Sequence, residues 1–181
     1  MIMQIIEYWR EIRARPWADV SGAAAGVFGM GLLTLFYVIK TNDDGFVPLL
    51  DHANLAFHEA GHLFFRVLGP TAALYGGTLG QLVFPVVALL TFWSRRAPIG
   101  AAAAGVWLFE NFLNIARYMA DARAQLLPLV GGGEHDWTNI LGRWGALHAD
   151  TSLAAAVRQI GWLGMLACAA WLAWRWSRSA R

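Results

Sequence analysis

Several long apolar stretches, each of a length that crosses a bilayer, constrain the fold of this chain more than any other feature. Residues 21–39, 71–93, 98–118 and 153–174 carry few charged side chains, and about 20 apolar residues suffice for a helix to span the hydrocarbon core. Only 14% of the residues are charged, whereas soluble domains usually contain about 25%. Because lipid offers the backbone no hydrogen-bond partners, such stretches must be helical. The sequence therefore predicts an all-α, polytopic membrane protein.

The number of membrane crossings depends on two further observations. Residues 46–68 are as long as the other stretches and are expected to form the second span, although they carry several titratable side chains. Residues 71–93 contain three glycines and Pro85, so they form either one ordinary span or a re-entrant hairpin that returns to the side it entered from. The sequence predicts four to five transmembrane helices in a single membrane domain over residues 1–181.

Charge placement distinguishes these two topologies, because Lys and Arg collect on the cytoplasmic side of short loops. A fully crossing 71–93 stretch places Arg95 and Arg96 opposite the basic N-terminal segment. A hairpin brings nine arginines to one side: Arg10, Arg13, Arg15, Arg66, Arg95, Arg96, Arg175, Arg178 and Arg181. Charge placement therefore favours the hairpin, and a five-span protein is the alternative.

The first 20 residues combine charges with apolar side chains at helical spacing. The apolar residues are Ile2, Ile5, Ile6, Trp9 and Ile12. This pattern predicts an amphipathic helix within residues 1–20 that lies on the membrane surface, with a solvated tail as the alternative. The charges also leave no apolar core for a cleavable signal peptide, so we expect none.

The remaining composition narrows the partners. The longest polar region, residues 121–150, is expected to be a loop region outside the spans. A formal net charge of +2 without a basic–aromatic module gives no indication of nucleic-acid binding. Membrane lipid is the expected surrounding, and the bacterial cytoplasmic (inner) membrane is the expected location.

The chemically most informative motif lies in the middle of residues 46–68. His58-Glu59-Ala60-Gly61-His62 is an H-E-x-x-H pattern, which on a helix puts His58 and His62 on one face as ligands of one metal ion. Glu59 is then placed to take a proton from a metal-activated water. Titratable side chains in an apolar segment are costly and by default mark a functional site. Zinc suits two imidazoles and an open coordination position.

A catalytic zinc site normally has three protein ligands, and the polar region offers candidates for the third. Asp121 follows the stretch 98–118, and His135 lies in a glycine-rich loop. Asp136 could bind directly or orient the His135 ring, and His148 resembles a loop end. Alternatively, Asp121 forms a helix-end ion pair with a neighbouring arginine, and His135 is a solvated loop residue.

Other polar residues lie in apolar segments. Glu110, Asn111 and Asn114 are expected to hydrogen-bond across helices, or else to hold an extended substrate backbone. Gln81 follows the glycine pair and either caps a broken helix or contacts substrate.

These motifs together resemble the site-2 protease group of intramembrane metalloproteases. The similarity covers residues 50–123 and consists of the H-E-x-x-H motif, the Gly76-Gly77 pair with its proline-interrupted stretch, and a later helix with Asn114 and Asp121. The resemblance implies His58 and His62 as zinc ligands, Glu59 as general base and Asp121 as third ligand. The chain also resembles uncharacterised bacterial membrane proteins that share the H-E-A-G-H motif, a G-G-x-x-x-Q motif and a His-Asp-Trp loop.

Two hypotheses about function follow. The first is a zinc-dependent membrane hydrolase, most simply a peptidase that acts on membrane proteins or peptides with Glu59 as general base. The second is a non-catalytic accessory subunit of a membrane complex with a structural metal or pigment site. Because about 180 residues are few for shielding such a site from lipid, a homo-oligomer or a partner in a membrane complex is also expected.

Overall fold

The computed structural model describes residues 2–42, 45–130 and 134–179, and these residues form helices and connections without any strand. The all-α prediction is confirmed. The helices are α1 (Ile2–Ala14), α2 (Gly22–Thr41), α3 (Pro48–Phe65), α4 (Pro70–Ser94), α5 (Pro98–Ala120), α6 (Asp136–Arg143) and α7 (Asp150–Ser179), with short 3₁₀ turns η2 (Arg66–Leu68) and η4 (Leu147–Ala149).

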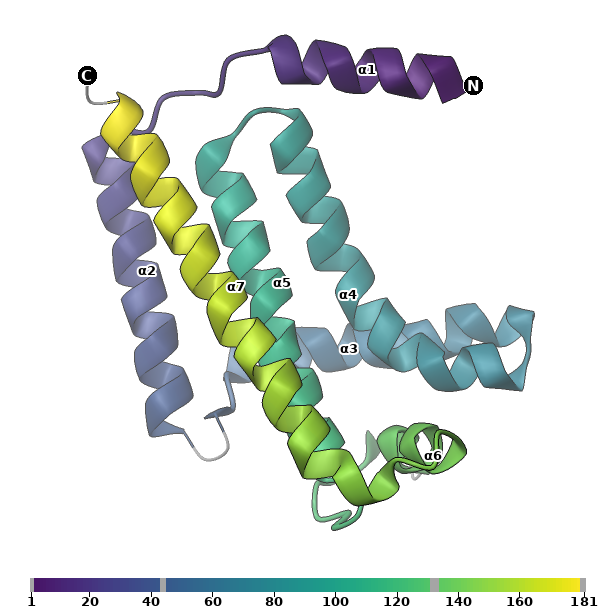
Figure 1. Ribbon diagram of the computed structural model, residues 1–181. Coiled ribbons are helices and arrows are strands. Elements are labelled where there is room, and N and C mark those ends of the chain that lie inside the picture. Colours follow the sequence, from purple (N-terminus) through teal and green to yellow (C-terminus); the bar gives the residue numbers. More distant parts are fainter. Residues whose placement is uncertain (1, 43–44, 131–133, 180–181) are drawn as a thin grey trace.

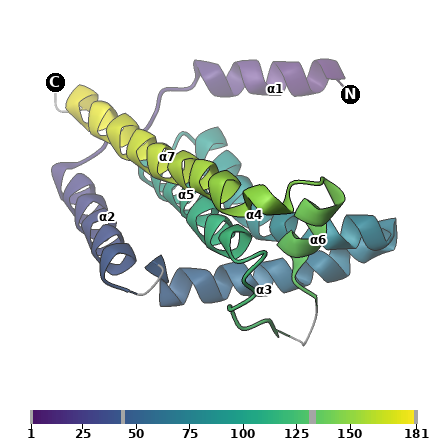
Figure 2. The ribbon, with the colours of Figure 1, turned by 60° about the horizontal axis from the view of Figure 1, so that its bottom comes forward.

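Four helical segments of the described chain are long and apolar enough to cross a membrane. They are α2, α4, α5 and the continuous segment of η4 and α7, and Figure 1 shows them running along one another. The motif stretch 46–68 does form a helix, α3, but it is not one of the four. Its acidic and histidine side chains lower its hydropathy, and α3 lies across the lower end of the bundle instead (Figures 1 and 2).

The stretch 71–93 lies within one continuous helix, α4, so the re-entrant hairpin is not formed. Pro85 lies inside this helix, where the missing N–H leaves the carbonyl of Gln81 without its helical partner. Such a position bends a helix. In Figure 1 the first part of α4 runs beside α3 and the second part turns up into the bundle.

Arginines gather at one end of the molecule as expected, but the predicted cause, a hairpin at residues 71–93, is not present. Main-chain N–H groups of the N-terminal segment bond to the α4–α5 turn and to the end of α7: Ala18 to the carbonyl of Arg96 at 3.0 Å, and Val20 to Ser179 Oγ at 3.0 Å. The helix that is not long and apolar enough to cross is α3, whereas residues 71–93 lie in a helix that is. Arg66, in η2 at the far end of α3, is therefore separated from the other arginines, and Arg181 lies outside the described residues.

The N-terminal segment forms the expected helix, and the polar region 121–150 contains helical elements where a loop was expected. Residues 2–14 form the expected N-terminal helix, whose position on a membrane surface stays a prediction. Residues 121–150, expected as loop, contain α6 and η4. The side chain of His135 accepts from the main-chain N–H of Thr138 at the start of α6, so the chain caps this helix locally.

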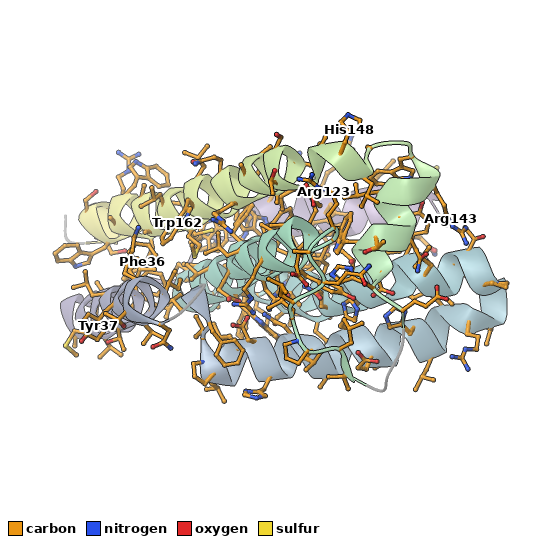
Figure 3. The ribbon with its side chains drawn as sticks, turned by 90° about the horizontal axis from the view of Figure 1, so that it is seen from below. Phe36, Tyr37, Arg123, Arg143, His148 and Trp162 are labelled. Carbon is orange, nitrogen blue, oxygen red and sulfur yellow. The ribbon has the colours of Figure 1, made fainter. Side chains whose placement is uncertain are left out.

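The centre of the bundle is α5, which packs most extensively against α7. Gly161 of α7 lies against Phe109 and Leu113 of α5, where an added Cβ would come within 2.8 Å of both residues. On the other side of α7, Phe36 of α2 meets Trp162 edge to face at 5.3 Å between ring centroids (Figure 3). Small residues thus let α5 and α7 approach closely, and aromatic rings fill the wider gap to α2.

The closest helix contact in the molecule's lower half joins α3 to the first part of α4. A Cβ at Gly80 would lie 2.5 Å from the carbonyl oxygen of Phe57, and one at Gly76 would lie 2.7 Å from the carbonyl oxygen of Gly61. Real Cβ atoms do not come so close, so only glycine fits at positions 76 and 80, and the main chains of the two helices are in contact there. Close approach of this kind is how membrane helices gain packing energy without a hydrophobic driving force.

Substitution Gly61→Ala should destabilise the protein by about 1–3 kcal/mol or more, because the added methyl overlaps the main chain of α4. Gly29→Ala is the matched control, since a Cβ at Gly29 of α2 meets nothing within 4 Å. Thermal unfolding in detergent should show a clear loss for the first variant and none for the second. Equal melting temperatures for the two variants would contradict the described contact.

Candidate metal centre

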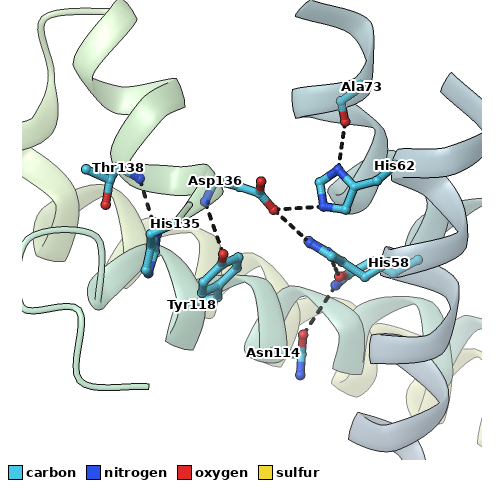
Figure 4. A network of polar contacts seen from close by, with 9 residues as sticks. His58, His62, Ala73, Asn114, Tyr118, His135, Asp136 and Thr138 are labelled. Atoms are coloured by element: carbon cyan, nitrogen blue, oxygen red, sulfur yellow. Dashed lines mark hydrogen bonds and ion pairs between the residues drawn. The ribbon is translucent and has the colours of Figure 1, made fainter. Parts of the chain in front are cut away.

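Two histidines of α3 and one aspartate of α6 converge on one point (Figure 4). Nε2 of His58 lies 2.8 Å from Oδ2 of Asp136, and Nε2 of His62 lies 3.1 Å from the same oxygen. The i, i+4 spacing puts both imidazoles on the face of α3 that looks toward α6. One ligand atom from each residue lies within 4.8 Å of the others, so the group could hold a metal ion.

The other ring nitrogens show how the two imidazoles are held. Nδ1 of His62 lies 2.8 Å from the carbonyl oxygen of Ala73, and Nδ1 of His58 lies 2.9 Å from Oε1 of Gln81. Because these oxygens only accept, each Nδ1 carries a proton and donates it. In the neutral rings both Nε2 atoms then present lone pairs to the carboxylate of Asp136. Three electron-pair donors this close require a positive charge among them, from a metal ion or from a proton on an imidazole.

The space beside the two nitrogens is kept open by a glycine of α4. A Cβ at Gly77 would lie 2.5 Å from Nε2 of His62 and closer still to Nε2 of His58. Any larger residue would therefore fill the volume next to both ligand atoms. Together with the fixed Nδ1–H donors, this arrangement fits a metal ion better than an isolated ion pair, because metal-binding histidines characteristically donate their second N–H to a protein oxygen.

A chain of buried polar groups continues from His58 into the bundle. Gln81 Nε2 lies 3.4 Å from Asn114 Oδ1, and Asn114 Nδ2 donates to Asp51 Oδ1 at 2.6 Å. The guanidinium of Arg117 pairs with the other oxygen of Asp51 at 3.2 Å. Gln81 thus orients His58, a member of the group that could hold a metal ion, and neither sequence interpretation of Gln81 included this role.

The other polar residues of α5 behave partly as expected. Asn54 of α3 donates to Oε2 of the buried Glu110 at 3.1 Å, and Asn114 reaches Asp51 of α3, so both make contacts across helices. Asn111 instead donates to the carbonyl of Trp107 within its own helix.

Asp121 and His135 lie outside the converging group and contact each other. The carboxylate of Asp121 accepts from the main-chain N–H groups of Leu126 and Leu127 at 2.8 and 3.0 Å, which closes the turn after α5. Nε2 of His135 lies 3.4 Å from Oδ2 of Asp121, without hydrogen-bond alignment. Burial lowers the pKa of His135 despite the nearby carboxylates.

The structure places the candidates for the third ligand differently from one another. The helix-end ion pair predicted for Asp121 is not formed with Arg117 or Arg123, which pair with Asp51 and with Asp150 instead. His148 is exposed and points away from α3 (Figure 3). Asp136, which the sequence offered either as a direct ligand or as a residue that orients His135, is the carboxylate that meets His58 and His62.

A cavity of about 910 Å³ opens beside the three residues. Its walls are α3, the start of α4, the end of α5, residues 127–130 and α6, and Glu59 is half-buried in the wall next to His58. The lining mixes charged with apolar side chains, among them Leu55, Leu63, Leu74, Arg66, Arg117, Arg143, Leu129 and Val130. The cavity therefore offers both polar and apolar contacts to a molecule bound next to His58, His62 and Asp136.

Comparison with known proteins identifies no relative of this chain. No family model matches it, and neither the curated proteins nor the solved structures contain a match. The case for a function therefore depends on the geometry of the site itself.

Substitution Gln81→Met should weaken zinc binding about 10- to 100-fold, because the N–H of His58 loses the acceptor that fixes the ring. Gln81→Glu, which keeps an acceptor oxygen, should retain most of the affinity. Gln159→Met on the exposed face of α7 is the matched control. Competition with a zinc chelator measures all three, and an unchanged affinity in Gln81→Met would contradict the orienting role.

Proposed function

We propose that this protein is a zinc-dependent hydrolase of the bacterial cytoplasmic membrane, most simply a peptidase. The observation that carries the proposal is the convergence of His58 Nε2, His62 Nε2 and a carboxylate oxygen of Asp136 beside a cavity that also contains Glu59. The ligand assignment replaces Asp121 and His135, which the sequence had offered, by Asp136.

The donor set supports zinc. Two imidazoles and one carboxylate, with room for a further ligand, form a type of set found in catalytic zinc sites. When bound, zinc supplies Lewis acidity that polarises a carbonyl group and acidifies water. The glycine at position 77 and the cavity leave the fourth position accessible.

Glu59 is proposed as the general base. Its carboxylate follows the first histidine directly in α3 and lines the same cavity, where it can accept a proton from the attacking water and pass it to the leaving amine nitrogen. Asp136 and His62 hold their positions during this transfer, because each is also bonded to the surrounding chain: the main-chain N–H of Asp136 donates to Tyr118 and the Nδ1–H of His62 donates to Ala73.

An amide bond in a peptide or membrane-protein segment is the proposed substrate, in line with the resemblance to site-2 proteases. In that resemblance an aspartate from a later part of the chain completes the zinc site, and Asp136 supplies such a carboxylate here. The apolar and charged lining of the cavity supports an amphiphilic segment as its occupant.

Elemental analysis of the purified protein tests the ligand set. Wild type should carry about one zinc ion per chain, as expected for one site, while His58→Ala and Asp136→Ala should lose it. Asp121→Ala and His135→Ala should keep it, because these residues contact each other rather than the converging nitrogens. Loss of zinc in Asp121→Ala with retention in Asp136→Ala would refute the assignment. A wild type without metal would favour the accessory-subunit hypothesis.

Substitution Glu59→Gln should leave the zinc content unchanged and lower peptide hydrolysis about 10²- to 10⁴-fold, the usual contribution of a general base. Glu134→Gln is the matched control, because Glu134 lines the same cavity and accepts only a side-chain hydrogen bond from Asn139 that is exposed. A quenched-fluorescent peptide library measures the turnover. Equal rates for wild type and Glu59→Gln would exclude the proposed mechanism.

A further inference from the structure

A second cluster of charged and aromatic residues lies at the opposite end of the molecule from the metal centre. It is formed where the N-terminal segment, the α4–α5 turn and the end of α7 meet (Figure 1). We call it the Arg–Trp cluster, and its members are Arg96, Arg175, Arg178, Trp17, Trp93, Trp171 and Trp174.

The indole of Trp17 is the centre of the Arg–Trp cluster. The guanidinium carbons of Arg96 and Arg175 lie 4.9 and 5.7 Å from the centroid of this ring. The rings of Trp93 and Trp171 meet it edge to face at 4.9 and 5.0 Å. The guanidinium groups of Arg96 and Arg175 therefore both contact the ring of Trp17, which the other two indoles hold in place. This arrangement concentrates positive charge.

Arg178 extends this charge toward the outside. Its guanidinium carbon lies 5.7 Å from the ring of Trp174, and that of Arg175 lies 5.8 Å from the same ring. Trp174 is 51% exposed, so the cluster reaches from the buried Arg96 to the molecular surface.

The arginines of the Arg–Trp cluster lack a counter-anion among the described residues. Every ion pair among the described residues involves Asp51, Asp121, Asp136 or Asp150, and none of these pairs includes an arginine of the cluster. Arg96 is only 8% exposed, and its Nε donates to a neutral partner, the carbonyl of Ile12 at 2.8 Å. Nε of Arg175 is buried without an acceptor. Because a buried guanidinium nitrogen is costly to leave unpaired, the cluster favours the binding of an anion.

The main chain at Arg96 gives independent support. The N–H of Arg96 bonds to the carbonyl of Trp93 at 3.1 Å and that of Ala97 bonds to the carbonyl of Phe92 at 3.0 Å, which is the Schellman arrangement at a helix end. Arg96 occupies the left-handed position of this motif with φ of 55°, where glycine is favoured. Such an outlier points to a function of the side chain.

We propose that the Arg–Trp cluster binds the phosphate of an anionic phospholipid headgroup. Guanidinium groups match phosphate oxygens in charge and geometry. Partly exposed tryptophans at the ends of apolar helices lie at headgroup level, and exposed apolar side chains such as Leu90 of α4 and Leu166 of α7 continue from there along the helices. Basic residues near a membrane surface attract the anionic lipids of the cytoplasmic leaflet. This site is independent of the proposed hydrolase activity.

Titration of the detergent-purified protein with phosphatidylglycerol, followed by native mass spectrometry, tests the proposal. Wild type should retain phosphatidylglycerol at least about 10-fold more tightly than phosphatidylcholine, as expected when charge-assisted hydrogen bonds are specific to the anion. The double variant Arg96→Gln/Arg175→Gln should lose this preference. Arg143→Gln, an exposed arginine at the other end of the molecule, is the matched control and should keep it.

A second variant separates lipid binding from folding. Arg96→Gly suits the left-handed backbone and should melt at the wild-type temperature or above in lipid-free detergent, yet lose the preference for phosphatidylglycerol. A preference for phosphatidylglycerol in both arginine variants equal to that of wild type would overturn the proposal. So would stabilisation by inorganic phosphate that equals stabilisation by phosphatidylglycerol, since this would show a site for free anions rather than for a lipid.

Discussion

The main-chain contact between α3 and α4 is the interaction on which the rest of the lower half depends. Gly61 lies directly against Gly76 and Gly80, so the two helices approach more closely than side chains would permit. This approach brings the carbonyl of Ala73 and the amide of Gln81 within hydrogen-bond distance of the two imidazoles. The same contact places Gly77 beside the ligand nitrogens. Packing and site geometry thus have one cause.

The polar face of α3 also explains the topology. Asp51, Asn54 and His58 are buried, and lipid would leave such groups without partners at a cost of several kcal/mol each. In the fold they bond to α4, α5 and α6, while Phe64 on the outer face stays exposed. A helix with one face of each kind is stable across the end of a bundle, where protein covers the polar face and lipid can cover the apolar one.

The sequence predicted those parts of the fold and site that depend on local spacing. The apolar stretches gave four helices that can span a membrane, and the four-residue separation of His58 and His62 placed both rings on one side of α3. The third member could not be chosen in this way, because Asp136 is 78 positions from His58 and meets it only through the path of the intervening chain. Asp121 looked equally suitable until the turn after α5 engaged its carboxylate. The predicted hairpin at residues 71–93 was wrong for a related reason. The glycines and Pro85 indicate a bend in this segment, but they do not show whether the helix continues beyond the bend.

The division of the metal-binding group between two walls of the cavity has a mechanical consequence. His58 and His62 belong to the α3–α4 pair, whose touching main chains allow little relative movement. Asp136 belongs to α6, which is attached to the end of α5 and the following turn through Tyr118 and Ala122, and to α4 through the bond from Arg143 to Thr71. Any displacement of α6 that widens the cavity withdraws this carboxylate from the imidazoles. Admission of a bulky molecule and retention of the complete group therefore oppose each other, and the width of the entrance is coupled to how tightly the group could hold an ion.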